Sequence, residues 1–437
     1  MYNQVADTKF HTIVKSCLDY EGVNFLKTII FIGTNKSGSS RDAIKAAVRL
    51  GYFTVLFTNK EKQIAQRKEY TDVHEMIFID TSDMAAMADA IRSMQSKGNE
   101  IMTIISFIDP NVSKALALCD MFCPNGVSSK AAALMENKAG TRALLEKHSS
   151  SPAFFIINPE DEWDFDDFEL SLGYNFPDFP VIVKSSSSTG SKDVIRVTDH
   201  VQLQKQVRKL REKAPEESVI IEEFIEGQQY LVEALVYERQ IMIAGIIQQE
   251  ITFGKRFIIT GYGVMSKVPK ELENSIRSVL TSIMQHFAIE NGAFHIEMRL
   301  TKKGWRLIEI NPRISGGAMN QMLKAAFGFD LAEETVKLYL GEQPSIVPAH
   351  RTFIFTQYVI VNERGILEKV TGKGRAKKTP GVVEVYVKPK KGTLLMPPLS
   401  MGHRYAYVIA TGETLSAAKK TAKQAAKEIH FHFLQNS

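Results

Sequence analysis

The chain has 437 residues, which is too long for one hydrophobic core and predicts two to four packed units. Its 44% hydrophobic and 24% charged residues are typical of a globular protein. The 54 basic residues nearly match the 49 acidic ones and are spread along the chain. We therefore expect no nucleic-acid partner, although a net charge of +5 suits a small anionic ligand.

The sequence also bears on location. No basic segment followed by an apolar run and a cleavage site opens the chain, and the apolar runs fall short of the roughly 20 residues that a membrane helix needs. Cys17, Cys119 and Cys123 form neither a disulfide pattern nor a zinc spacing. We therefore expect a cytoplasmic protein without a membrane partner.

The first part of the chain alternates between strand and helix patterns. Residues 1–26 precede the first strong strand and are expected to form an added helix or arm. The predicted strands lie at 28–33, 53–59, 75–80 and 101–108, and the predicted helices at 39–52 and 84–98. This alternation predicts a parallel sheet covered by helices. The first turn, GTNKSGSSR, lacks the G-x-G-x-x-G pattern, so a dinucleotide site is not favoured.

Further along, the pattern changes twice. A helix is predicted from residue 128 toward a Ser-Pro connection that ends near 154. Strands are then predicted at 179–184, 193–198, 218–225 and, as an antiparallel pair, 229–249, with helices at 199–213 and 270–288. After residue 345, short strands and a final helix, TLSAAKKTAKQAAKEIHFHF, predict a small α+β unit.

A hairpin is predicted in GAFHIEMRLTKKGWRLIEINPRISGG, which ends at Gly317. A three-residue loop, Lys302-Lys303-Gly304, would place Glu297 opposite Glu309, His295 opposite Asn311 and Met298 opposite Ile308. One face would then be polar and the other apolar. A two-residue loop would move Glu297 among the isoleucines, so the three-residue loop is the prediction.

The facing acids of this hairpin indicate a metal site. Two opposed carboxylates repel each other, and a hard divalent cation with oxygen ligands relieves that repulsion. Arg313 continues the polar face and offers a planar fork for an anion. Gly316 and Gly317 are predicted at a helix start, where backbone N–H groups can hold a carboxylate or phosphate. The alternatives are a solvent-facing sheet surface paired by lysines, and an ordinary tight turn.

Two other segments favour nucleotide binding. In PVIVKSSSSTGS, Lys184 ends a strand and is followed by small residues that let backbone amides approach phosphates. In IIEEFIEG, the backbone before Gly227 can read the edge of an adenine. Taken alone, the first segment is equally typical of a flexible turn and the second of a strand and turn.

In this order and spacing, the three motifs resemble the ATP-grasp superfamily. The resemblance is to the carboxylate–amine ligases, which include L-amino acid (dipeptide) ligases and, more distantly, biotin carboxylase and D-alanine ligase. It runs from about residue 28 to the C-terminus. It implies an α/β (α+β) ATP-grasp fold with an N-terminal parallel α/β domain (1–127), a two-lobed nucleotide-binding domain (128–345, with a mobile lid lobe at about 151–225) and a C-terminal α+β subdomain (346–437).

The resemblance also implies roles for particular residues. The expected ATP contacts are Lys138, Lys184, Ser185, Ser188, Thr189, Gly190, Ser191, Glu222, Glu223, Phe224, Ile225 and Gln229. Glu297, Glu309 and Asn311 would hold Mg²⁺, with Mn²⁺ as the alternative. Lys184 and Arg313 would be catalytic, and Arg313 would contact the substrate together with Gly316 and Gly317.

The chain departs from the family pattern at two places. A glutamate that usually holds the ribose after the hinge is replaced by Gln229. Dipeptide ligases tend to carry an acid and a histidine in the loop that corresponds to RFIITGYGVMSKVP, where this chain has Ile259, Thr260 and Tyr262. The second departure favours a carboxylate substrate other than a free amino acid that is held by its ammonium group.

The implied function is an ATP-dependent ligase that converts a carboxylate to an acyl phosphate and joins it to an amine, with release of ADP and phosphate. The expected partners are small-molecule carboxylates and amines, with a homodimer as the expected assembly among similar ligases. Arg404 is a candidate anion contact. Three alternatives stay open: a biotin-carboxylase-like carboxylase, a ligase acting on a carrier-protein-bound group, and a non-catalytic ATP-binding protein.

Overall fold

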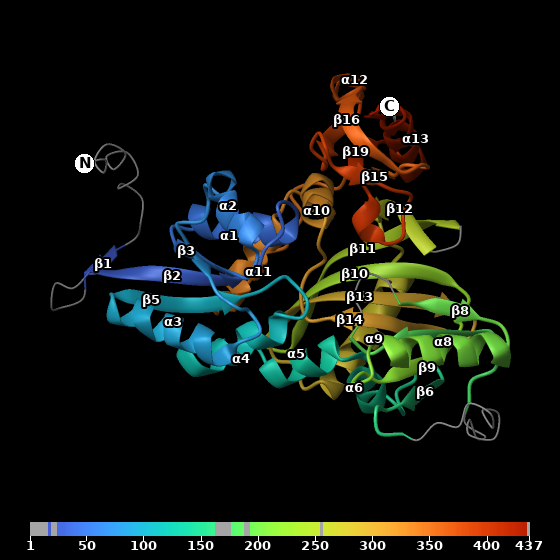
Figure 1. Cartoon of the computed structure of the whole chain (residues 1–437), viewed down its shortest axis with the longest axis horizontal. Helices are drawn as coiled ribbons and strands as arrows, with labels where there is room; N and C mark the ends of the chain where they lie inside the picture. The colour runs from blue at the N-terminus through green and yellow to red at the C-terminus, as the bar shows by residue number, and fades with distance from the viewer. Residues whose placement is uncertain (1–15, 19–23, 162–175, 188–192, 254–256, 435–437) are drawn as a thin grey trace.

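The computed structural model describes residues 16–18, 24–161, 176–187, 193–253 and 257–434. An N-terminal sheet with its helices lies beside a large central sheet, and the last quarter of the chain projects from one end of that sheet (Figure 1). A smaller four-stranded sheet lies against the central one. The predicted mixed α/β class is confirmed.

The N-terminal sheet is largely parallel, as predicted. Strand β2 pairs in parallel with β3 and β5, and β3 pairs in parallel with β4. Its strands are β1 (Ser16–Leu18), β2 (Asn24–Ile32), β3 (Phe53–Thr58), β4 (Glu75–Phe78) and β5 (Asn99–Ile105). The helices in this part are α1 (Ser39–Arg49), α2 (Glu61–Ala65), η1 (Arg67–Glu69), α3 (Met84–Ser96) and α4 (Val112–Phe122).

One expectation for this half of the chain was wrong, and another becomes more specific. Within the expected helix or arm at 1–26, residues 16–18 form an antiparallel strand on β2, because β2 begins at Asn24 and offers its edge to them. The single helix expected after residue 128 is two helices, α5 (Ser129–Glu136) and α6 (Lys138–Leu144). Asn137 separates them because its backbone is extended and its side chain accepts a hydrogen bond from the Gly140 N–H, which caps α6.

The four-stranded sheet is antiparallel and has the order β6-β9-β7-β8. Its strands are β6 (Phe154–Ile157), β7 (Val181–Ser185), β8 (Ile195–Val197) and β9 (Val219–Glu223). Helix α8 (His200–Lys213) covers it with Leu203, Val207 and Leu210, which recur at helical spacing and are buried against the strands.

The central sheet has eight strands in the order β14-β13-β10-β11-β12-β15-β19-β17. They are β10 (Gln228–Tyr237), β11 (Gln240–Phe253), β12 (Phe257–Val264), β13 (Gly292–Thr301), β14 (Gly304–Asn311), β15 (Phe353–Val359), β17 (Val382–Val387) and β19 (Ala406–Gly412). Helix α9 (Lys270–His286) packs Ile276, Leu280 and Ile283 against one face of the sheet. Helices α10 (Met319–Phe327) and α11 (Leu331–Tyr339) share a second core with the other face and with the N-terminal unit.

The C-terminal strands β15, β19 and β17 thus extend the central sheet instead of forming a separate one. The remaining elements are β16 (Gly365–Thr371), α12 (Lys373–Lys378), β18 (Leu394–Leu395), η2 (Met401–His403), α13 (Leu415–Ala426) and β20 (His430–Phe433). The predicted final helix ends at Ala426, and HFHF pairs with β16 as a strand. The prediction of a helix through these four residues was wrong, because a strict alternation of His and Phe is typical of a strand.

The hairpin of β13 and β14 has the predicted polar face but a different turn. Glu297 lies opposite Glu309 and His295 opposite Asn311, as predicted. The loop, however, has two residues, and Met298 pairs with Leu307 instead of Ile308. A bulge at Ile308 restores the register, so that Trp305 and Leu307 stay in the core while Glu309 faces the polar side.

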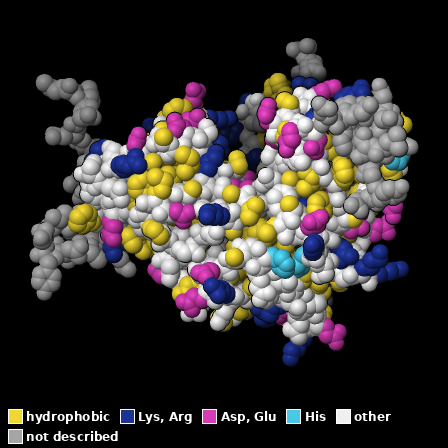
Figure 2. Space-filling view, turned by 90° about the horizontal axis from the view of Figure 1, so that it is seen from below, with side chains coloured by type: hydrophobic (Ala, Val, Ile, Leu, Met, Phe, Trp, Pro, Cys, Tyr) yellow, Lys and Arg dark blue, Asp and Glu magenta, His cyan; other side chains and the backbone are white. Residues whose placement is uncertain are grey.

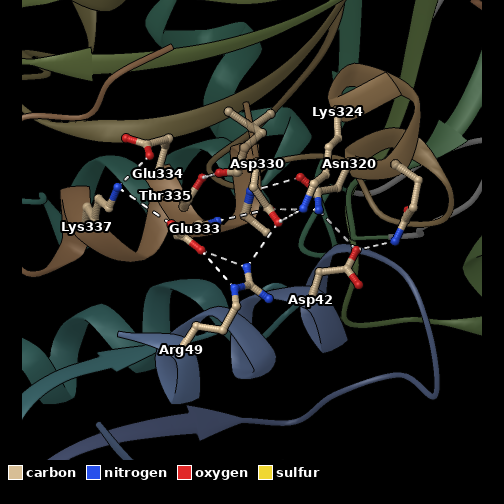
Figure 3. Close-up of polar contacts among 12 residues, drawn as sticks. Asp42, Arg49, Asn320, Lys324, Asp330, Glu333, Glu334, Thr335 and Lys337 are labelled. Atoms are coloured by element: carbon tan, nitrogen blue, oxygen red, sulfur yellow. Dashed lines mark hydrogen bonds and ion pairs between the residues drawn. The ribbon is translucent and has the colours of Figure 1, made fainter. Parts of the chain in front are cut away.

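A polar network joins the N-terminal unit to helices α10 and α11 (Figure 3). The carboxylate of Asp42 on α1 accepts hydrogen bonds from Asn320 at 3.2 Å and from Gln321. Arg49, at the end of the same helix, donates to Asp330 at 3.1 Å and to Glu333 at 2.8 Å. These contacts fix α1 against the helices that follow the hairpin.

The described surface is mixed in charge. On the face shown in Figure 2, basic and acidic side chains alternate with scattered hydrophobic ones, without a continuous basic band among the coloured side chains. Within the described ranges, no helix combines the length and the apolar character needed to cross a membrane.

Candidate active site

A cavity of about 410 Å³ lies between β7 and β9 of the small sheet and the polar face of the central sheet. The structure brings most of the predicted site residues together in its lining. These are Lys138, Lys184, Glu222, Glu223, Phe224, Ile225, Gln229, Glu297, Glu309, Asn311, Arg313, Gly316 and Gly317. Ser185 is buried beside the cavity and donates its hydroxyl to Glu217. Ser188, Thr189, Gly190 and Ser191 lie outside the described residues.

Lys184 belongs to a buried chain of charges. Its Nζ lies 2.7 Å from Oε2 of Glu222, whose Oε1 accepts from Nε of Arg142 at 2.6 Å. Burial lowers the pKa of Lys184, and the nearby Glu222 charge partly offsets this effect. Burial alone would raise the pKa of Glu222, but Arg142 and Lys184 outweigh it and lower the pKa. Glu222 is therefore ionised and holds Lys184 in place.

Arg142 is a residue that the sequence prediction missed. Its Nη2 donates to the carbonyls of Leu307 and Ile308, at 3.0 and 2.9 Å, where the hairpin bulges. One guanidinium thus connects the bulge to Glu222. The sequence could have indicated Arg142, because it follows Lys138 by four residues and therefore lies on the same face of a short helix.

The hinge segment lines the cavity, while the N–H groups of Glu223 and Phe224 donate to the carbonyls of Ala153 and Pro180. Glu222 was predicted as an ATP contact, but its carboxylate is already bound to the two cations described above. Glu223 at the end of β9 lines the cavity together with Phe224 and Ile225, and Arg299 donates to the carbonyl of Ile225. Arg299 also donates from Nε to Oε1 of Gln229 at 3.1 Å.

Glu297 and Glu309 face the same space from neighbouring strands. Glu297 accepts a hydrogen bond from Gln229 at 2.7 Å, and Glu309 lies 3.4 Å from Nζ of Lys138. No group of three His, Cys, Asp or Glu side chains suited to a metal occurs in the described part of the chain. The third predicted donor, Asn311, is an amide. Two carboxylates and one amide oxygen in a shared cavity fit the oxygen preference of Mg²⁺.

His295 is held behind these acids. Its Nδ1 lies 2.6 Å from Glu233, and its Nε2 lies 3.5 Å from Glu297. Burial alone would lower the pKa of His295, but Glu233 and Glu297 outweigh burial and raise the pKa to about 10. Glu233 in turn accepts from the Ser315 N–H at 2.9 Å, so the imidazolium positions both the acid pair and the loop that follows it.

Arg313 forms a two-pronged ion pair with Asp109, at the end of the N-terminal sheet. Nε donates to Oδ1 at 2.8 Å, and Nη2 donates to Oδ2. Burial lowers the pKa of Arg313, but Asp109 outweighs it, so the guanidinium stays charged. Its partner comes from a segment that sequence motifs did not single out.

The loop after Arg313 is fixed by the N-terminal unit. Gly316 and Gly317 lie just before α10, which begins at Met319, close to the predicted helix start. Ser39 donates its hydroxyl to the carbonyl of Ser315 at 2.5 Å. Gly38 lies so close to this loop that a Cβ added to it would be 2.5 Å from the Gly317 oxygen. The serine-rich first turn therefore supports the site from behind.

The far end of the cavity contains residues that the motifs did not cover. Gln249, Tyr262, Tyr358 and Arg404 line it, and the Arg404 guanidinium lies 3.9 Å from the centroid of the Tyr358 ring. Burial raises the pKa of Tyr262 to about 12, so its hydroxyl stays protonated. The candidate anion contact Arg404 is thus part of the cavity.

Two protein-family models match parts of the chain. Residues 177–321 match the model of the ATP-grasp domain. The chain therefore carries an ATP-grasp domain. Residues 357–433 match the model of L-amino acid ligase C-terminal domain 2.

Several curated proteins are similar to parts of the chain. The uncharacterized protein y4rH of Sinorhizobium fredii is 25% identical over 57% of this chain and 52% of its own length. Carnosine synthase 1 of Gallus gallus is 25% identical over 34% of this chain and 16% of its own length. Dapdiamide A synthase of Enterobacter agglomerans is 26% identical over 34% of this chain and 37% of its own length. The chain thus spans about half, or less, of the length of these relatives.

Solved structures share the fold over nearly the whole chain. The L-amino acid ligase from Bacillus licheniformis superposes with a TM-score of 0.79 at 19% identity, covering 94% of this chain and 99% of that one. The biotin carboxylase domain of the Hydrogenobacter thermophilus 2-oxoglutarate carboxylase, in complex with MgADP and bicarbonate, gives 0.66 at 16% identity, covering 93% and 91%. The predicted ATP-grasp fold is confirmed.

Proposed function

We propose that the chain is an ATP-dependent carboxylate–amine ligase that forms an amide or peptide bond and releases ADP and phosphate. One observation carries this proposal: the facing acids Glu297 and Glu309 share a cavity with Lys184 and Arg313. The relatives named as carnosine synthase and dapdiamide synthase support it, as does the match to the C-terminal domain of L-amino acid ligases.

The proposed reaction has two steps. A carboxylate oxygen of the acid attacks the γ-phosphorus of ATP, the bond to the bridging oxygen breaks, and ADP leaves. The amine nitrogen then attacks the acyl carbon, loses a proton, and phosphate leaves. Bond formation needs no nucleophile from the protein, so alignment and charge neutralisation supply the catalysis.

Different residues would contact different parts of the nucleotide, the metal and the acyl phosphate. Lys184 and Lys138 would neutralise the nucleotide phosphates, and the backbone of Glu223, Phe224 and Ile225 would bind adenine. Gln229 would approach the ribose without a charge. Ser185 at the end of β7, with Ser188, Thr189, Gly190 and Ser191 after it, would approach the phosphates. Glu297, Glu309 and Asn311 would hold Mg²⁺, or Mn²⁺, which when bound neutralises phosphate charge. Arg313, with Gly316 and Gly317, would steady the acyl phosphate.

The three alternatives lead to different substrate requirements. The likeness to a biotin carboxylase domain supports a bicarbonate reaction only at the level of the fold. ADP release should be measured with a panel of carboxylates and amines, tested in pairs, and with bicarbonate. Amine-dependent release supports the ligase, bicarbonate dependence supports the carboxylase, and dependence on a carrier protein supports a ligase with a bound substrate. ATP binding without release under any condition supports the non-catalytic protein.

The metal role has its own test. Glu309→Gln keeps the size of the side chain but removes its charge, and we expect turnover to fall at least a hundredfold while the unfolding midpoint stays close to that of the parent protein. Glu428→Gln, which alters an exposed ion pair with Arg375, is the matched control. Near-normal activity of Glu309→Gln would refute the metal role.

We further propose a cytoplasmic homodimer. Its support is the behaviour expected of similar ligases, including a biotin carboxylase domain whose structure is described as a dimer. Light scattering of the purified chain tests the assembly, and a monomeric mass would contradict it.

A further inference from the structure

The end of the cavity around Arg404 carries a positive charge without an acid. Arg404 donates from Nε to the Met401 carbonyl at 3.2 Å and from Nη1 to the Ile259 carbonyl at 3.4 Å. Its guanidinium stacks on Tyr358 and lies 5.7 Å from the ring of Tyr262. Among the described residues, no carboxylate lies within ion-pair distance of Arg404.

At the opposite end, three of the cationic side chains lie beside acids, and a fourth, Arg299, donates to the hinge and to Gln229 instead. Arg313 has Asp109, Lys184 has Glu222, and Lys138 lies beside Glu309. Near the Arg404 end, but outside the cavity lining, the exposed Lys388 carries a second positive charge, and its Nζ donates to the Gly402 carbonyl at 2.8 Å. Partial burial lowers the pKa of Lys388, and the positive charge of Arg404 lowers it further. The two cations are therefore close enough for their charges to interact. An anion entering this end would meet attraction without a competing acid.

Gln249 provides an independent sign of a missing ligand. Both the Nε2 and Oε1 atoms of its side chain are buried, and neither has a hydrogen-bond partner among the described residues. It lines the same cavity and lies opposite Tyr262 in the pairing of β11 with β12. A buried amide without partners is costly, so this end is built to receive a polar group.

The Arg404 end is separate from the place where phosphate would transfer. Tyr262 lies on β12, while Glu297 lies on β13, with β10 and β11 between them. Three strand spacings of about 4.8 Å separate these backbones by roughly 14 Å. The side chains enter one cavity, and the Glu297 charge still acts on Tyr262, but this spacing leaves room for Arg404 to bind a second carboxylate of the acid that is phosphorylated beside Glu297 and Glu309.

We propose that the acid substrate is a dicarboxylate, and that Arg404, with Gln249 beside it, binds the carboxylate that does not react. This inference rests on the proposed ligase function and narrows its substrate class. It agrees with the segment Ile259–Tyr262, which offers no acid for an ammonium group and whose Ile259 carbonyl accepts a hydrogen bond from Arg404. The site thus selects an acid by its distal negative charge.

Hydroxylamine makes the test independent of the natural amine, because it traps an acyl phosphate as a hydroxamate. Succinate and glutarate should be compared with butyrate and valerate, which have the same chain lengths but one carboxylate. We expect a dicarboxylate to give at least tenfold higher kcat/KM than its monocarboxylate counterpart. Arg404→Gln should raise KM for the dicarboxylate by roughly tenfold to a hundredfold, leave the monocarboxylate value unchanged, and be partly rescued by Arg404→Lys. Arg375→Gln, an exposed arginine of the same C-terminal region, is the control.

Binding provides the second measurement and separates this inference from the ligase proposal. Calorimetry of the same acids on the full chain, with a non-hydrolysable ATP analogue present, needs no turnover. Arg404-dependent binding of a dicarboxylate without hydroxamate would support the site and contradict the ligase. The inference is overturned if monocarboxylates bind or react as well as dicarboxylates, or if Arg404→Gln affects both classes equally. The inference is also overturned if Arg404→Gln lowers activity only with amines that carry a carboxylate, for example with glycine but not with glycinamide.

Discussion

At the scale of single residues, the site depends on charges whose protonation is set by their neighbours. His295 is the clearest case, since two carboxylates hold a proton on a buried imidazole. Its pKa rises from 6.5 in a free histidine to about 10 in the folded chain. Folding therefore favours the protonated form, and this stabilisation is complete below pH 6.5 and lost as the pH rises through about 10.

This shift predicts a pH-dependent difference in stability. Without added metal, His295→Gln should be less stable than the parent protein by a few kcal/mol below pH 6.5, and the gap should narrow steadily toward pH 10. Urea unfolding at several pH values measures it, with the exposed His430→Gln as control. Because the first variant leaves Glu233 buried without its partner, the double variant His295→Gln with Glu233→Gln should recover part of the loss. A gap that is constant with pH would contradict a shared proton.

Lys184 allows a prediction about the nucleotide. Lys184→Met keeps most of the side-chain volume, and Glu222 still has Arg142, so the fold should persist. We expect affinity for a non-hydrolysable ATP analogue to fall about tenfold or more, because a charge-assisted contact is lost. Calorimetry measures the affinity, and Lys213→Met, which removes an exposed lysine of α8, is the control. Equal affinities of the two variants would argue against a phosphate contact.

At the scale of elements, the hairpin shows how much the sequence could predict. The alternation of acids and isoleucines was enough to place Glu297 opposite Glu309, since any other register buries a charge. The turn could not be derived from alternation alone. It depends on whether Trp305 and Leu307 enter the core, and that is decided by packing against α9, which local sequence does not report.

Arg142 connects the bulge of the hairpin to Glu222. Replacing it with methionine removes the donor for two bulge carbonyls and leaves Glu222 with one cation. We expect Arg142→Met to lower the free energy of unfolding by about 3 kcal/mol, and Arg142→Lys to recover part of it. Chemical unfolding measures the change, and hydrogen exchange of residues 304–311 should rise in the variant. Unchanged exchange there would show that the bulge does not need Arg142.

At the scale of the whole molecule, distant parts of the chain meet behind the site. The order of motifs was enough to predict the fold, because each motif belongs to one element of it. The pairs Arg313–Asp109 and Ser39–Ser315 could not be predicted, since they join residues more than 200 positions apart. The boundaries at 127 and 345 stay predictions, and the continuous central sheet crosses the second of them.

Gly38 tests how closely these parts must fit. Its φ of 86° favours glycine, and an added Cβ would lie 2.5 Å from the Gly317 oxygen. Gly98 has a similar φ of 90° but no heavy atom within 4 Å of such a Cβ. Gly98→Ala should therefore cost about 1 kcal/mol from backbone strain alone, and Gly38→Ala clearly more.

The same pair of variants distinguishes stability from function. Gly38→Ala should also reduce ligase turnover, because it pushes α1 away from the loop that carries Gly317, whereas Gly98→Ala should not. Unfolding and ADP-release assays on both variants measure these effects. If both variants lose stability and activity equally, the close approach has no special role.

The continuous central sheet also has an evolutionary consequence. The strands proposed to serve ATP lie at one edge of the sheet, whereas Tyr358 and Arg404 belong to the segment that follows α11. Exchange of this segment between related genes would then change the contact made by Arg404 while leaving Gln249, Tyr262 and the proposed phosphorylating machinery unaltered. Chimeras joined after α11 are thus a natural route to enzymes with altered selectivity.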